Sequence, residues 1–160
     1  HYQVAALEGM ARNCGVEVAY VKPHGALYND MMAKPDVRAA VMRALSACHR
    51  PLPLMLQATG DAGAHREEAR CAGIDLLFEA FADRCYDDSG RLVARSQPGA
   101  VHDRERMLAQ VRQLLDDASV TTASSKRLPV CADSLCVHGD NPEGVRAIED
   151  IRELVRQSRR

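Results

Sequence analysis

The stretch Leu52-Pro-Leu-Met-Leu-Gln-Ala-Thr-Gly-Asp-Ala-Gly-Ala-His-Arg-Glu-Glu-Ala-Arg-Cys-Ala-Gly-Ile-Asp-Leu-Leu-Phe-Glu79 contains two short apolar runs separated by a polar segment. The runs over 52–57 and 74–79 are short, rich in Leu and bounded by breakers, which is typical of buried strands. Asp61 can begin a helix between them, and Gly73 can end it. A strand, a helix and a second strand in succession predict a βαβ unit with parallel strands.

The same alternation continues outward in both directions. Strands are expected over 16–21 and 132–137, and helices over 1–14, from Pro35, and from the capping residue Asp103. A last helix is expected with Asn141 as its cap and Pro142 at its first position. We expect Val145, Ile148, Ile151 and Val155 to form its buried face, and residues 119–130 to be irregular. The expected class is therefore α/β.

Composition and net charge limit the kinds of protein that this sequence can encode. The 160 residues are 46% hydrophobic and 27% charged, with a net charge of −1, which indicates one globular domain with a substantial core. No basic region, Trp-rich platform or long apolar run is present, so we expect neither nucleic-acid binding nor a membrane role. Six Cys without a Cys-x-x-Cys spacing, and no visible signal peptide, indicate reduced thiols in a cytoplasmic protein.

Polar side chains follow each of the four predicted strands. In parallel α/β folds the carboxyl ends of strands converge and bind ligands. Convergence of four such groups predicts one site rather than four unrelated features. Its expected members are Lys22, His24, Asn29, Gln57, Glu79, Asp83, Arg84, His138, Asp140 and Asn141.

The expected chemistry follows from the residue types. His24 and His138 suit proton transfer near neutral pH or metal ligation, and Asp140 can orient an imidazole or ligate a metal itself. A lone His is nevertheless more often a structural hydrogen-bonding group. His1, His49, His65 and His102 lack a supporting motif and are expected at the surface or at helix ends.

The remaining charged residues allow two interpretations each. Glu79 and Asp83 bracket a strand end and suit general acid or base chemistry. Lys22 and Arg84 suit binding of a carboxylate, a phosphate or an oxyanion. Asp83 and Arg84 can equally form a simple salt bridge or clamp a loop, and Asn141 can merely cap the last helix.

Several familiar catalytic motifs are absent from the sequence. It contains no Gly-x-x-x-x-Gly-Lys-Ser/Thr phosphate loop and no Gly-x-Gly-x-x-Gly dinucleotide fingerprint. It also contains no Gly-x-Ser-x-Gly elbow and no His-Glu-x-x-His zinc helix.

The segment Lys22-Pro-His-Gly-Ala-Leu-Tyr-Asn29 closely resembles the signature of the LamB/YcsF family, the A subunit of the ATP-dependent 5-oxoprolinase. The resemblance continues through Glu79-Ala-Phe-Ala-Asp-Arg84, Leu92-Val-Ala-Arg95 with Pro98-Gly-Ala-Val101, and Cys136-Val-His-Gly-Asp-Asn-Pro142. Tyr2-Gln3 and Ala6-Leu7 resemble the helix before the first motif, so the match spans nearly the whole chain.

The resemblance implies a distorted seven-stranded β/α barrel like that of carbohydrate deacetylases. It also implies an activity: with partner subunits B and C and ATP, the family opens the lactam of 5-oxo-L-proline to give L-glutamate. ATP is expected to act by phosphorylating the lactam oxygen, and a divalent metal is a further expected cofactor.

Within that family the site residues take expected roles. Lys22 and Arg84 would bind an anion or oxyanion. His24, Glu79 and His138 would transfer protons or act as ligands, His24 and His138 being the metal candidates, and Asp83 and Asp140 would orient them. The substrate-binding candidates are Asn29, Gln57 and Asn141.

The family pattern includes an N-terminal third ahead of His1, so residues 1–160 would form the C-terminal two-thirds of one family domain. A barrel lacking its first strands exposes sheet edges. We therefore expect this chain to be catalytically impaired and prone to oligomerise as a homo-oligomer.

Two other functions stay open. One is a metal-dependent amidohydrolase or deacetylase that works alone without ATP. The other is a non-catalytic ligand-binding fragment, which would bind a small lactam without turning it over.

Overall fold

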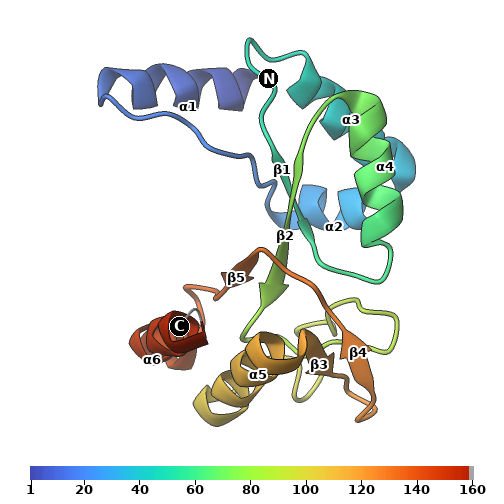
Figure 1. The fold of residues 1–160 in the computed structure, drawn as a ribbon, viewed down its shortest axis with the longest axis vertical. Coiled ribbons are helices and arrows are strands. Elements are labelled where there is room, and N and C mark those ends of the chain that lie inside the picture. Colours follow the sequence, from blue (N-terminus) through green and yellow to red (C-terminus); the bar gives the residue numbers. More distant parts are fainter. Residues whose placement is uncertain (159–160) are drawn as a thin grey trace. The chain divides into compact units, whose positions relative to one another are not determined.

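The computed structural model describes residues 1–158 and shows alternating helices and strands (Figure 1). The helices are α1 (Tyr2–Asn13), α2 (Gly25–Ala33), α3 (Pro35–Ser46), α4 (Ala62–Ala72), α5 (Arg104–Asp117) and α6 (Pro142–Ser158). The strands are β1 (Leu54–Gln57), β2 (Leu76–Phe81), β3 (Ser119–Thr121), β4 (Arg127–Pro129) and β5 (Ser134–Cys136). Among these residues, no helix combines the length and apolar character that crossing a membrane requires.

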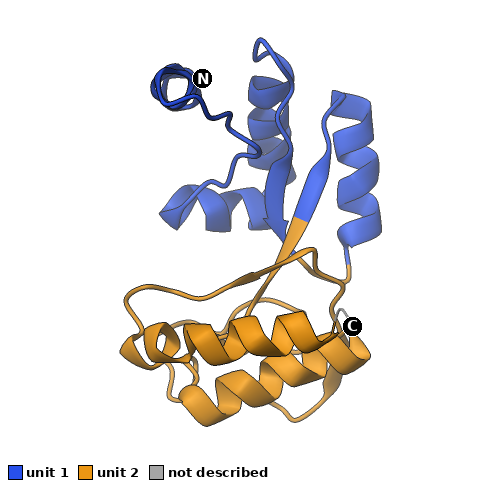
Figure 2. Ribbon diagram, turned by 60° about the vertical axis from the view of Figure 1, so that its left-hand side comes forward, with its two compact units in different colours: residues 1–57, 61–77 blue, residues 58–60, 78–160 orange. Residues whose placement is uncertain are grey.

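The chain divides into two compact units (Figure 2). Unit 1 comprises residues 1–57 and 61–77, and unit 2 comprises residues 58–60 and 78–160. The three-stranded sheet has the order β1-β2-β5, so β2 is the strand that both units share. The pairing of β2 with β5 is parallel, which confirms the expected α/β class with a parallel sheet.

The predicted βαβ unit is present, and its helix ends at the expected glycine. β1 is buried along its whole length, and Gly73 ends α4 in the left-handed conformation at φ +71°. Both strands begin two residues later than the apolar runs do. At β1 the reason is Pro53, which has no backbone N–H to contribute to a ladder. The N–H of Leu54 makes the first such bond, to the carbonyl of Asp75 at 2.9 Å.

The N-terminal part of unit 1 differs from expectation in two ways. Residues 16–21 do not form a strand; Val21 alone makes a bridge, to Leu54. The helix α1 forms as predicted but buries none of its residues, and Leu7 on its apolar face is 55% exposed. Figure 1 shows α1 joined to the rest of unit 1 by this extended segment.

The helix α2 is not among the helices expected from the sequence. Its signal is the pair Tyr28 and Met31, apolar residues three apart that are both buried. Gly25 masked this signal, because glycine is typical of turns. It is the first residue of α2 and adopts φ +61°, a conformation that glycine adopts without strain.

Unit 2 is held together by packing between α5 and α6. Its core comprises Ala82, Met107, Leu108, Val111, Ala147 and Ile151. The cap of α5 is as predicted, since the Asp103 carboxylate accepts the N–H of Arg106 at 2.9 Å.

The predicted buried face of α6 is wrong in part. Ile151 is buried, but Val145 and Ile148 are each 48% exposed, and the inward positions are instead Gly144, Ala147 and Ile151. The reason is close packing: a Cβ on Gly144 would lie 2.8 Å from Cγ1 of Val137. Small residues therefore mark the contact face, which a search for large apolar residues misses.

Two further expectations are corrected in the structure. Residues 119–130 are not wholly irregular, because β3 and β4 pair as an antiparallel hairpin in which Val120 faces Leu128. The β-branched residues of β3 favour a strand despite the surrounding Ser and Thr. His65 and His102 are buried rather than at the surface.

We predict that Gly144→Ala lowers the free energy of unfolding by about 1–3 kcal/mol, because the new methyl group overpacks the contact with Val137. Denaturant unfolding of the 160-residue chain measures this. The matched control is Gly63→Ala in α4, where nothing lies within 4 Å of the new Cβ. The control is expected to be neutral or stabilising by up to about 1 kcal/mol. Equal stability of both variants would contradict the packing account.

We predict that Tyr86→Phe lowers the free energy of unfolding by about 1–3 kcal/mol, because it removes a buried hydrogen bond. The Tyr86 hydroxyl oxygen accepts the N–H of Phe81 at 2.8 Å in the interior. Tyr2, which is 86% exposed, supplies the control Tyr2→Phe. Thermal or denaturant unfolding checks the pair, and a Tyr86 variant as stable as its control would refute the assignment.

Candidate functional site

Asp83 and His138 form a hydrogen-bonded pair in unit 2. Asp83 lies two residues after β2, and His138 lies two residues after β5. The parallel register, with Phe81 opposite Cys136, carries both segments out of the sheet at the same edge. There, Nδ1 of His138 lies 3.0 Å from Oδ1 and 3.1 Å from Oδ2 of Asp83. The Oδ2 atom also accepts the backbone N–H of His138, at 3.2 Å.

The surroundings of this pair define its protonation chemistry. An ionised carboxylate accepts hydrogen bonds but cannot donate them, so beside ionised Asp83 the Nδ1 atom of His138 is the donor and Nε2 points away from the pair. The Asp83 side chain is 1% exposed, whereas that of His138 is 27% exposed. The imidazole also stacks on Phe81, with ring centroids 5.4 Å apart and an interplanar angle of 15°. The arrangement is a buried carboxylate that orients a partly accessible base.

Among the hydrogen bonds of the described residues, none joins the Asp140 carboxylate to His138. Asp140 forms a bidentate ion pair with Arg95, and the Nη2–Oδ1 distance is 3.3 Å. The hydrogen bonds from Arg95 lower the pKa of the Asp140 carboxyl, which keeps it ionised. The pair joins the loop before α5 to the turn before α6 at an exposed position.

Arg84 is placed as a loop clamp. Its guanidinium donates to the carbonyl of Val93 at 2.7 Å and to that of Ala100 at 3.4 Å. Burial and then the nearby charge of Arg95 lower the pKa of Arg84. A salt bridge between Asp83 and Arg84 is absent from the ion pairs of the described residues. Anion binding by Arg84 stays a prediction.

Glu79 and Asn141 are also in unit 2. Glu79 is a fully buried residue of β2, and its carbonyl accepts the N–H of Ala58 at 2.8 Å. Asn141 comes directly before α6, and its carbonyl accepts the N–H of Val145. Its side-chain amide donates to the carbonyl of His102 at 3.3 Å, so Asn141 joins two loops as well as beginning a helix.

The other predicted site residues belong to unit 1. The Lys22 ammonium lies 5.9 Å from the centroid of the Tyr28 ring, a cation–π distance. His24 is the exposed N-cap residue of α2 and makes no side-chain cap bond. Asn29 is exposed on α2, and Gln57 is buried at the end of β1. Their participation in one site stays a prediction.

Sequence reasoning missed three residues around the Asp83–His138 pair. Gln110 on α5 is buried and lies against three backbone carbonyls, His102 is buried beside it, and Arg95 pairs with Asp140. For Gln110 the available signal was its place among the apolar positions of α5, since an uncharged amide in a buried stripe needs partners.

Metal ligation needs several donors that converge. Across residues 1–158, no three His, Cys, Asp or Glu side chains come together as a metal-binding group. His138 offers one ring nitrogen, while Asp140 is engaged by Arg95. The described residues therefore do not fit a complete metal centre.

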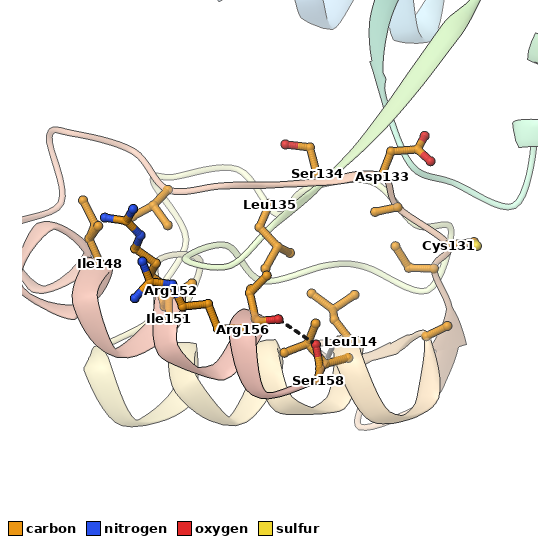
Figure 3. Close-up of a pocket in the computed structure, with 16 residues that line it drawn as sticks. Leu114, Cys131, Asp133, Ser134, Leu135, Ile148, Ile151, Arg152, Arg156 and Ser158 are labelled. Atoms are coloured by element: carbon orange, nitrogen blue, oxygen red, sulfur yellow. Dashed lines mark hydrogen bonds between the residues drawn. The ribbon is translucent and has the colours of Figure 1, made fainter. Parts of the chain in front are cut away.

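A separate apolar groove of about 790 Å³ lies in unit 2 between α5, β5 and α6 (Figure 3). Its lining residues include the apolar side chains of Leu114, Leu135 and Ile151. Arg152 and Arg156 of α6 also line it. None of the predicted site residues lines it. The groove is therefore separate from the candidate site at the Asp83–His138 pair.

The chain resembles known proteins along its whole length. The family model described as "LamB/YcsF family" matches residues 1–160. The A subunit of a 5-oxoprolinase from Chromohalobacter salexigens is 51% identical over 153 residues, covering 95% of this chain and 61% of the relative. The corresponding protein from Pseudomonas fluorescens is 48% identical over 158 residues, covering 98% and 63%.

A solved structure agrees with these relatives. The crystal structure of a lactam utilization protein from Thermus thermophilus matches with a TM-score of 0.83 and 33% identity, covering 96% of this chain and 62% of that one. The chain thus spans about three-fifths of the length of the relatives it matches. With a family model matched from end to end and relatives at about half identity, this chain belongs to the LamB/YcsF family.

Proposed function

We propose that this chain is part of the A subunit of an ATP-dependent 5-oxoprolinase, which hydrolyses 5-oxo-L-proline to L-glutamate together with partner subunits B and C. Relatives of about 50% identity are named as A subunits of 5-oxoprolinase, and the structural relative is named for lactam utilization. Because the chain spans about three-fifths of these relatives, the proposal concerns the role of this portion within the whole protein.

The observation that carries the proposal is the Asp83–His138 pair. Opening a lactam requires a base that activates water and an acid that protonates the departing nitrogen. His138 offers a lone pair on Nε2 at a partly exposed ring, and Asp83 holds that ring from the buried side. One imidazole can serve both steps in turn, since it returns the proton it has taken.

In the proposed reaction, water attacks the lactam carbonyl carbon, a new C–O bond forms, and Nε2 of His138 takes the proton that water loses. The C–N bond then breaks, and the ring nitrogen receives that proton to become the amino group of glutamate. Asp83 stabilises the imidazolium that exists between these steps. The new carboxylate is the γ-carboxylate of the product.

ATP belongs to the proposal as a reactant of the whole complex: it transfers its γ-phosphoryl group to the lactam oxygen before water attacks the ring carbon, giving ADP, and a second water later releases that group from the product carboxyl as inorganic phosphate. The cationic groups on the segments around the pair are already engaged, Arg84 by two carbonyls and Arg95 by Asp140. They do not form a free cradle for a triphosphate, so no step on this chain is assigned to the nucleotide. The same holds for a divalent metal, because a convergent donor set is absent from residues 1–158.

The proposed architecture is part of a distorted seven-stranded β/α barrel of the deacetylase-like kind. The parallel pairing of β2 with β5 and the strand–helix alternation support this proposal. The proposed location is the cytoplasm, in line with a substrate that is a small metabolite.

We predict ATP-dependent glutamate release from 5-oxo-L-proline when the A subunit, subunits B and C, and ATP are combined. The assay is run on this chain and on a chain extended to the length of the relatives. Release by the extended chain only with ATP supports the proposal. Release without ATP or partners favours a stand-alone amidohydrolase instead, and failure of both chains counts against 5-oxoprolinase activity.

We predict that His138→Gln and Asp83→Asn each reduce kcat in that assay by about 10²- to 10⁴-fold. The first removes the base, and the second offers an amide donor that favours the wrong imidazole tautomer. Arg104→Gln is the matched control, because it removes only a surface ion pair with Asp150. Full activity of either site variant would rule out the assigned roles.

A further inference from the structure

We propose that Gln110 and His102 are positioning residues that set the geometry of the Asp83–His138 pair. The inference rests on the proposed function to the extent that this pair is the reacting base. Neither residue faces the reaction. Both act on the backbone segments that carry Asp83 and His138.

Gln110 holds the segment that carries Asp83. It is buried on α5, and its Nε2 lies 2.7 Å from the carbonyl oxygen of Phe81, 3.3 Å from that of Ala82 and 2.9 Å from that of Arg84. These carbonyls come from the end of β2 and from both sides of Asp83. One side-chain amide therefore fixes the path of the backbone through Asp83.

The orientation of this amide determines the state of His102. Turning the amide over would place Oε1 against three carbonyl oxygens, so Nε2 must face them and Oε1 must face away. Oε1 lies 3.2 Å from Nε2 of His102, which must then donate. His102 is consequently protonated on Nε2, and burial lowers its pKa, which favours the neutral ring.

His102 extends the network to the segment that carries His138. Its backbone N–H donates to the carbonyl of Asp83 at 2.9 Å, and its carbonyl accepts the side-chain amide of Asn141 at 3.3 Å. The N–H of Asn141 donates in turn to the carbonyl of His138 at 3.2 Å. A chain of hydrogen bonds thus runs from Gln110 through His102 and Asn141 to His138.

This hydrogen-bond network controls the position of the Asp83 carboxylate relative to the His138 imidazole. Asp83 reaches His138 through two short contacts, at 3.0 Å and 3.1 Å from Nδ1, and such contacts are sensitive to shifts of a few tenths of an ångström. Loss of the Gln110 amide removes the hydrogen bonds that these three carbonyls beside Asp83 accept from it. The carboxylate then loses its fixed position relative to the imidazole, even where the fold persists.

The test is the variant Gln110→Met, which keeps the length of the side chain and removes its polar atoms. Long-range ¹H–¹⁵N spectra of the imidazoles in the full 160-residue chain report the tautomer of His138, with all variants recorded at the same pH. The wild type is expected to show His138 protonated on Nδ1, and Gln110→Met to show a mixture of tautomers. Amide exchange at His138, relative to that at Val111, is expected to accelerate at least about tenfold.

The matched control is Gln113→Met, one turn further along α5. Gln113 bonds Ser119 and Thr121 on β3 and makes no contact with the Asp83 segment among its hydrogen bonds. If the side-chain amides on α5 only stabilised the fold, Gln110→Met and Gln113→Met would change the His138 spectrum to a similar extent. An unchanged His138 spectrum in folded Gln110→Met, or an equal change in Gln113→Met, overturns the proposal.

A second variant, His102→Phe, decides the matter if Gln110→Met does not fold. It retains a buried ring and the backbone bonds of residue 102 but removes the side-chain link to Gln110. A smaller shift of His138 toward mixed tautomers supports the proposal, and a wild-type spectrum counts against it. Because no readout involves turnover, the result stands whether or not glutamate release is found.

Discussion

The parallel pairing of β2 with β5 is the constraint on which the candidate site depends. It places the residues after Phe81 beside those after Cys136, and so brings Asp83 to His138 across 55 positions of sequence. The pairing is extended at its start by Asp133, whose carboxylate accepts the N–H of Phe78 and whose own N–H donates to the carbonyl of Phe78. With a different register, the Asp83 carboxylate and the His138 imidazole would not lie within hydrogen-bonding distance of each other.

The two members of the pair differ in burial. Asp83 is enclosed and tied through its backbone to His102, while His138 keeps one ring nitrogen directed away from the carboxylate. A buried carboxylate is costly unless it is hydrogen-bonded, so the bonds from His138 are needed for stability as well as for orientation. The same enclosure explains why the polar residues around it, Gln110 and His102, form a connected network.

The sequence revealed the fold class and part of this site for identifiable reasons. Apolar runs between breakers located β1 and β2, and Asp83 and His138 stood out because polar residues follow strands. Their pairing was not predictable, since register is set by packing between distant segments. Gln110 escaped notice for a related reason: its partners are backbone carbonyls, which leave no trace in the residue types. The contact at Gly144 was not predicted either, because close helix packing there requires a small side chain, which a search for large apolar residues does not detect.

A crystal structure of the 160-residue chain tests the central claim most directly. The account predicts that Nδ1 of His138 lies about 3 Å from the carboxylate of Asp83, with the imidazole stacked on Phe81. A separation above about 4 Å, or Asp83 paired with a different group, would contradict it.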